Sequence, residues 1–186
     1  MADKKGKFAT PEWLVGSKVY LRPATPEDVA TFQYWSEQSN PEMLSCHAQP
    51  FLTPTQAAEK YKNREVSTSH QKFAVIRKDD QMLVGSVVFF NYNELNRSAE
   101  LGLLIDPDER KNGHGKEALQ LLASYLFKQR GLNKVYAQTA EPNEATVALL
   151  EGLGFKKDAT LRDHYFFNSE FHNGVIYSLL LFELHW

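Results

Sequence analysis

The amino-acid sequence predicts one mixed α/β domain over residues 1–186, with a mostly antiparallel sheet and flanking helices. Three β-rich runs follow one another in the middle of the chain, which predicts an antiparallel meander. A run of helical periodicity then leads to another β-rich run, and this order predicts a central βαβ crossover with parallel strands. A chain of this length buries about two-thirds of its unfolded surface in a single core, so a second domain is not expected.

The first third of the chain predicts a strand followed by two helices. Residues 1–12 are polar and predict a flexible lead. Lys18–Arg22 alternates polar and apolar side chains, which predicts a strand that stops before the proline that follows. A threonine cap, a proline and two acids start a helix at Thr25, and Thr53-Pro54 starts a second helix over 56–65.

The middle of the chain predicts the meander and the crossover. Its three strands, 72–77, 82–92 and 97–105, are separated by turn-forming residues. The following helix, over 118–127, has apolar residues at the spacing of one buried face. A strand over 134–139 completes the crossover.

The last part of the chain predicts a short helix and a hairpin. The helix starts after Asn143 and runs to Gly152. Residues 155–167 and 175–183 are expected to pair as the hairpin, with a turn near 168–173. No repeat or low-complexity tract interrupts this order of elements.

Composition argues against several kinds of protein. The net charge is −2 and the 21 basic residues are dispersed, which does not favour a nucleic-acid groove. No apolar stretch is long enough to cross a bilayer and no signal peptide is apparent, so we expect no membrane association and a cytoplasmic location. Cys46 is the one cysteine and the six histidines lack metal-ligand spacing, so neither a disulfide nor a metal site is expected.

A glycine-containing loop precedes the amphipathic helix. It consists of Arg110, Lys111, Asn112, Gly113, His114, Gly115 and Lys116. Two glycines one residue apart let the backbone turn tightly and bring its N–H groups close to an anion. The helix that follows offers unpaired N–H groups and the positive end of its dipole to the same anion. The loop is therefore predicted to bind a phosphate group.

Two nucleotide-binding alternatives fit the loop less well. A nucleoside triphosphatase needs a longer spacing between its glycines and a Lys-Ser or Lys-Thr pair, whereas Glu117 follows Lys116 here. The dinucleotide fingerprint G-x-G-x-x-A is present from Gly113 to Ala118. However, several strands precede it, and a further segment separates it from the end of the preceding strand. A nicotinamide-dependent oxidoreductase therefore stays the less favoured alternative.

Two motifs resemble those of the GNAT N-acetyltransferases. Arg-x-x-Gly-x-Gly at Arg110–Gly115 is similar to the pyrophosphate-binding motif of that family, and Asn143–Phe155 is similar to its Asn-x-x-Ala…Gly-Phe segment. Tyr20–Pro23 and Arg162–Leu180 resemble the branch of ribosomal-protein N-terminal acetyltransferases and spermidine acetyltransferases. The resemblance spans 19–184. It implies a GNAT fold and acetyl-CoA-dependent acetylation of a primary amine, either of a polyamine such as spermidine or of a peptide or protein N-terminus.

The resemblance also implies where the cosubstrate acetyl-CoA binds. Backbone N–H groups of residues 110–116 would bind its pyrophosphate. The strand at Leu103, Leu104 and Ile105 would diverge from the next strand and leave backbone groups for the pantetheine arm and the carbonyl oxygen. Asn143 would contact the CoA arm, although capping of the following helix is a complete explanation for this residue.

Glu100 and Thr146 are the catalytic candidates. Glu100 is a carboxylate in an apolar strand, on the face of Leu104, and is suited to accept the amine proton through water. A solvated position, or pairing with Arg97, is the structural alternative. Many relatives have at the position of Leu150 a tyrosine that protonates the leaving thiolate, so the resemblance makes Thr146, one turn earlier, a substitute hydroxyl or else an ordinary helix residue.

Other features leave the acceptor and the turnover open. Three tyrosine hydroxyls could also reach the cleft, those of Tyr136, Tyr165 and Tyr177. Because position 150 lacks the tyrosine, a CoA-binding regulatory protein without turnover is an alternative. Cys46 lies far from the motifs, so we expect direct transfer of the acetyl group without a covalent carrier.

The acceptor site is expected between the first two helices and the final hairpin. Four acids could attract a cationic amine there or lie on solvated helix faces: Glu27, Asp28, Glu37 and Glu42. Phe166–Phe171 resembles the corresponding segment of spermidine acetyltransferases, and a hairpin turn with core aromatics gives the same pattern. The sequence leaves open whether the protein forms a homo-oligomer.

Overall fold

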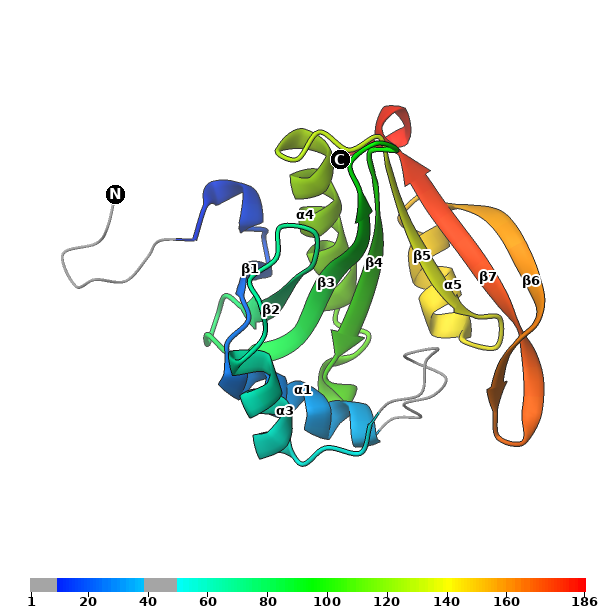
Figure 1. Ribbon diagram of the computed structural model, residues 1–186. Coiled ribbons are helices and arrows are strands. Elements are labelled where there is room, and N and C mark those ends of the chain that lie inside the picture. The colour runs from blue at the N-terminus through cyan, green and yellow to red at the C-terminus, as the bar shows by residue number, and fades with distance from the viewer. Residues whose placement is uncertain (1–9, 39–49) are drawn as a thin grey trace.

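Seven strands form one mixed sheet, in the order β1-β2-β3-β4-β5-β7-β6, in the computed structural model, which describes residues 10–38 and 50–186 (Figure 1). The strands are β1 (Val19–Pro23), β2 (Gln71–Arg77), β3 (Leu83–Asn93), β4 (Ser98–Ile105), β5 (Lys134–Ala140), β6 (Lys156–Phe167) and β7 (Glu170–Leu180). The helices are α1 (Pro26–Gln38), α3 (Pro54–Lys62), α4 (His114–Lys128) and α5 (Glu144–Glu151), with short 3-10 helices at Glu12–Leu14, Pro107–Glu109 and Leu181–Glu183.

The pairing of the strands confirms the predicted meander and crossover. Strands β1 to β4 are antiparallel neighbours in chain order. Strand β4 is parallel to β5, and α4 joins the two. The β6–β7 hairpin adds to β5 through β7, which completes a mostly antiparallel sheet. The expected α/β fold class is therefore confirmed.

Alternating residues of the sheet pack against different helices. Phe73 and Val75 of β2 belong to the main core, together with the apolar stripe of α4. Their neighbours Ala74 and Ile76 pack with Phe32 of α1 instead. Because successive side chains of a strand point to opposite faces, α4 covers one face of this part of the sheet and α1 the other.

The sheet opens between β4 and β5, as expected from the resemblance. The two strands pair only from Ser98 to Glu100, opposite Lys134 to Tyr136. Beyond this point β4 continues to pair with β3, and β5 continues to pair with β7. The facing edges of β4 and β5 therefore diverge (Figure 1), and their backbone groups are not used in a common ladder.

The final hairpin has a tighter turn than the sequence analysis predicts. Only Asn168 and Ser169 separate β6 from β7, and both have positive φ, +52° and +66°. Positive φ at both central residues is the geometry of a two-residue hairpin loop. The expected turn at 168–173 is therefore wrong, because β7 begins at Glu170, and that strand ends at Leu180 rather than at residue 183.

Other boundaries differ as well. Helix α4 begins at His114 instead of at residue 118, so the last residues of the expected loop form its first turn. Strand β1 includes Pro23, which an edge strand tolerates because one side of its backbone has no partner strand. Helix α3 begins at the predicted Thr53 cap but ends at Lys62, where Asn63 caps it, instead of at residue 65. Glu12, the last residue of the expected lead, begins a 3-10 helix. Residues 1–9 of that lead lie outside the described residues.

Candidate active site

The loop before α4 has the open backbone that an anion needs. Gly113 is the N-cap of α4 and has a φ of +84°, which a side chain would strain. A Cβ atom at Gly115 would lie 3.1 Å from Leu103 Cδ2 and 3.3 Å from Ile105 Cγ1. Gly115 therefore lets the first turn of α4 pack directly against the end of β4. The two glycines place the helix N-terminus beside the opening between β4 and β5.

Side chains hold the rest of the loop in place. Lys18 Nζ donates a hydrogen bond to the carbonyl oxygen of Asn112 at 3.0 Å. Arg110 is exposed, and its Nε donates to the carbonyl oxygen of Ile105 at 3.4 Å. Lys111 and Lys116 are exposed beside the helix N-terminus.

His114, the first residue of α4, is buried, and its Nδ1 has no hydrogen-bond partner among the described residues. A buried polar atom without a partner is unusual in a folded protein. Here it lies in the same turn as the open backbone of Gly113 and Gly115. The loop therefore offers backbone N–H groups and cationic side chains to an anionic ligand.

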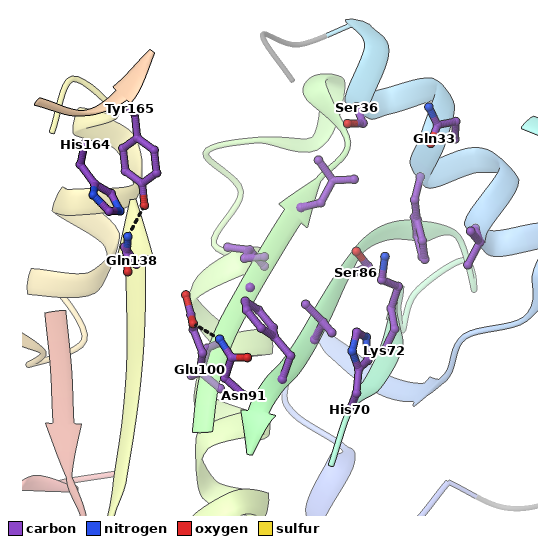
Figure 2. A pocket seen from close by; sticks show the side chains of 18 residues that line it. Gln33, Ser36, His70, Lys72, Ser86, Asn91, Glu100, Gln138, His164 and Tyr165 are labelled. Carbon is purple, nitrogen blue, oxygen red and sulfur yellow. Dashed lines mark hydrogen bonds between the residues drawn. The ribbon is translucent and has the colours of Figure 1, made fainter. Parts of the chain in front are cut away.

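A pocket of about 640 Å³ lies on the α1 face of the sheet and reaches the β4–β5 opening. Residues of α1, β3 and β4 line most of it, and the others come from β2, β5, β6 and His70, which precedes β2. The predicted residues Glu100, Leu103 and Leu104 are among them. Figure 2 shows Glu100 between two groups of side chains, with His164 and Tyr165 on one side and Lys72 and His70 on the other.

Glu100 is fixed by a neighbour on β3. Its Oε2 accepts a hydrogen bond from Asn91 Nδ2 at 2.8 Å. Asn91 has a φ of +49° at a register shift in the β3–β4 ladder, between Phe90 and Asn93. Such a bulge changes the direction of a side chain. Arg97, the alternative partner, donates to the carbonyl oxygen of Gly131, and Glu100 is half-buried instead of solvated.

Aromatic and amide side chains form the opposite wall of the pocket. The hydroxyl of buried Tyr165 accepts a hydrogen bond from Gln138 Nε2, and both residues line the pocket beside His164. A second register shift, near Asp163 with a φ of +48°, bends β6 just before these residues. Of the three tyrosines considered from the sequence, Tyr165 is the one that lines the pocket.

The other two tyrosine hydroxyls have different neighbours. Tyr136 pairs in register with Glu100. Its pKa is raised by burial and by the Glu100 charge. Tyr177 donates a hydrogen bond to Glu151 Oε1 at 2.9 Å, and burial together with Glu151 raises its pKa. Both groups are therefore held in the neutral form at physiological pH.

The second motif is built around a helix cap. Asn143 is buried, and its side-chain oxygen accepts from Thr146 N while its Nδ2 donates to Thr139 Oγ1 at 3.1 Å. This confirms the capping role. Leu150 is fully buried in the main core. Thr146 is half-buried and does not line the pocket.

The three described acids of α1 do not line the pocket either. Asp28 is buried and paired with Arg22 at 2.5 Å, which connects α1 to β1. Glu37 accepts from Gln33 Nε2 at 2.9 Å, and Glu27 is exposed. Glu42 and Cys46 lie outside the described residues.

Sequence reasoning missed most of the polar pocket residues. Lys72 lies at the start of β2 and His70 just before it, where polar residues look like an ordinary strand end. Asn91 comes from a bulge and has a left-handed backbone conformation. The only local signal in the sequence is the residue type, because asparagine adopts this conformation more often than most residues. Within residues 10–38 and 50–186, no group of metal-ligating side chains occurs and no helix is long and apolar enough to cross a membrane.

The site and fold match a known family. Residues 18–156 match the acetyltransferase (GNAT) domain. The chain therefore belongs to the GNAT acetyltransferases, and the expected family, fold and N-acetyltransferase class are confirmed. Enzymes of this class transfer an acetyl group from acetyl-CoA to an amine. The dinucleotide alternative has no support in this match.

Similar proteins include several that are named as N-acetyltransferases. The uncharacterized N-acetyltransferase YoaA of Bacillus subtilis is 30% identical over 109 residues, which are 59% of this chain and 62% of YoaA. Spermidine N(1)-acetyltransferase of Vibrio cholerae is 25% identical over 138 residues, 74% of this chain and 73% of that protein. The crystal structure of spermidine N-acetyltransferase from Vibrio cholerae in complex with CoA and spermine is similar with a TM-score of 0.82 at 22% identity. The similarity covers 90% of this chain and 98% of that one, and it shows a shared fold.

Proposed function

We propose that this chain transfers an acetyl group from acetyl-CoA directly to a primary amine bound in the pocket beside Glu100. The observation that carries this proposal is the opening between β4 and β5, which connects the loop before α4 to the pocket. Acetyl-CoA would bind from the loop side and the amine from the α1 side. The two reactants would then meet in a ternary complex at the end of the β4–β5 ladder.

The donor side fits acetyl-CoA. Backbone N–H groups of residues 110–116 at the start of α4 would bind the pyrophosphate, with charge from Arg110 or Lys111. Beyond Glu100, the edge of β4 that faces away from β3 would pair with the amide groups of the pantetheine arm. A backbone N–H on this edge would also polarise the thioester carbonyl. Asn143 would position the arm only through α5, because both ends of its side chain are already bonded.

The reaction needs one base and one acid. The amine nitrogen attacks the carbonyl carbon of the thioester, a C–N bond forms, and the C–S bond breaks. Glu100 would receive the amine proton through water. The thiolate would take a proton from a hydroxyl, for which Thr146 was the expectation. Tyr165 is a second candidate because it lines the pocket at the β5 edge of the opening.

Release of CoA in the presence of amines tests this function. The purified chain would be given acetyl-CoA and a panel of polyamines, amino acids, aminoglycosides and peptides with free N-termini. The relatives named for spermidine make polyamines the first acceptors to assay, followed by N-terminal amines. We expect one molecule of N-acetylated amine for each molecule of CoA thiol that is released. CoA binding without turnover on any acceptor would instead support a regulatory CoA-binding protein. A cytoplasmic location and a homo-oligomer are predictions that fractionation and light scattering can check.

A further inference from the structure

The two ends of the pocket floor differ in charge. Glu100 is the one carboxylate among the described residues that line the pocket. Lys72 lines the far end on β2, and its ammonium lies 5.9 Å from the centre of the Phe32 ring. No carboxylate pairs with Lys72 among the described residues. Among the described residues, the pocket therefore has an ammonium without a carboxylate partner at one end and a carboxylate at the other.

The Arg64 guanidinium adds positive charge near the Lys72 end. Burial lowers the pKa of Lys72, and the Arg64 guanidinium adds to this effect. Burial also lowers the pKa of His70, with further contributions from Lys72 and Arg64. A second ammonium of a polyamine would be repelled at this end, whereas an anion there would replace the water that Lys72 loses on burial.

Strand register sets the spacing of the two ends. Lys72 is opposite Val88, which is opposite Gly102, while Glu100 is in the next row on the same face. Two strand spacings and one two-residue step separate the Cα atoms of Lys72 and Glu100 by roughly 12 Å. Because both side chains extend into the pocket, a short molecule can contact both of them. Their separation suits an amine and an acid that are joined by a few carbon atoms.

We propose that the acceptor is a small primary amine that also has a carboxylate, with Lys72 binding the carboxylate while Glu100 faces the amine. This inference rests on the proposed function and names its substrate class. A single ammonium matches a group with a single negative charge. Lys72 is then a specificity-determining residue, and polyamines are the poorer acceptors.

Three amines with the same five-carbon chain test the proposal: δ-aminovalerate, pentylamine and cadaverine. They end in a carboxylate, a methyl group and a second ammonium. We expect kcat/KM for δ-aminovalerate to exceed that for cadaverine by about 10-fold or more, as for a hydrogen bond to a charged group. Lys72→Gln should abolish the preference and Lys72→Glu should reverse it. The same charge change at exposed Lys60 of α3, Lys60→Gln, should leave it intact.

A binding measurement separates this proposal from the proposed function. Valerate has the carboxylate but no amine. It should raise the melting temperature of the CoA-bound protein more than pentylamine does. This effect should be lost in Lys72→Gln. If no amine is acetylated, the proposed function fails and valerate binding still decides whether the anion site exists. Cadaverine acetylated as well as δ-aminovalerate, a preference unchanged in Lys72→Gln, or valerate binding independent of Lys72 would each overturn the proposal.

Discussion

Asn91 and Glu100 are joined across β3 and β4 by a hydrogen bond of 2.8 Å from the amide Nδ2 to the carboxylate Oε2. The bond depends on a bulge, because Asn91 lies at the register shift after Phe90. It holds the carboxylate at the last residue of β4 that pairs with β5, where the β4–β5 opening begins. The bulge therefore fixes the position of the proposed base.

Glu100→Gln should lower kcat at neutral pH by about 100-fold or more, since a glutamine cannot accept the amine proton. The affinity for CoA should be unchanged, because the loop before α4 is not altered. Steady-state kinetics and a CoA titration check both expectations. Glu94→Gln, in the exposed turn after β3, is the control with the same chemical change. A Glu100→Gln enzyme with the wild-type rate would remove Glu100 from the mechanism.

Gly113→Ala should weaken CoA binding by about 10-fold, because the left-handed conformation costs a side chain about 1–2 kcal/mol and the new methyl group narrows the loop. A Cβ at this position would also lie 3.2 Å from Lys18 Nζ. Gly131→Ala imposes a similar strain, at a φ of +67°, just beyond the other end of α4. Calorimetric titration with CoA should show a loss of affinity in Gly113→Ala alone. Equal losses in both variants would mean that the loop does not bind CoA.

Tyr165→Phe and Thr146→Val separate the two candidate hydroxyls for the thiolate. Tyr165 lines the pocket, and its hydroxyl accepts a hydrogen bond from Gln138 Nε2. We expect Tyr165→Phe to lower kcat by about 10-fold or more and Thr146→Val to leave it within about 3-fold. Assays with a thioester whose thiol is more acidic should reduce the difference. The reverse order of the two effects would assign the role to Thr146.

Local patterns explain why much of the donor site could be predicted from the sequence. Short stretches of sequence are enough to recognise the glycines at 113 and 115 and the cap at Asn143. The structure places them at the starts of α4 and α5. The prediction that β4 diverges from β5 depends on the resemblance alone. No periodicity shows where a ladder ends, because both strands continue to pair with their other neighbours.

The acceptor pocket could not be predicted in the same way. The register of β2, β3 and β4 places Lys72 and Glu100 on the same face of the sheet, and no single segment of sequence specifies this register. Asn91, His164 and Tyr165 are turned by bulges, so simple alternation fails near them. The acids on α1 do not mark the acceptor site, since Asp28 pairs with Arg22.

Glu117 should contribute to stability in a pH-dependent way. Its carboxylate accepts hydrogen bonds from the backbone N–H groups of Ser17, Lys18 and Val19 and from the Ser17 hydroxyl, at 2.6–2.8 Å. Burial alone would raise the pKa of Glu117, but these bonds outweigh burial and the pKa lies below its ordinary value of 4.5. A carboxylate with a lowered pKa stabilises the folded state above the unfolded-state value, and this stabilisation is lost as the pH falls through the folded-state pKa.

Glu117→Gln should therefore lower the free energy of unfolding at neutral pH by about 1–3 kcal/mol, because an amide offers one acceptor oxygen and turns N–H donors toward backbone donors. The difference from the wild type should shrink below pH 4.5, where the wild-type carboxylate becomes protonated. Urea unfolding across this pH range measures both quantities. Glu144→Gln, an exposed first-turn glutamate of α5, is the matched control and should show no such dependence. A destabilisation by Glu117→Gln that is constant with pH would mean that the charge is not what joins β1 to α4.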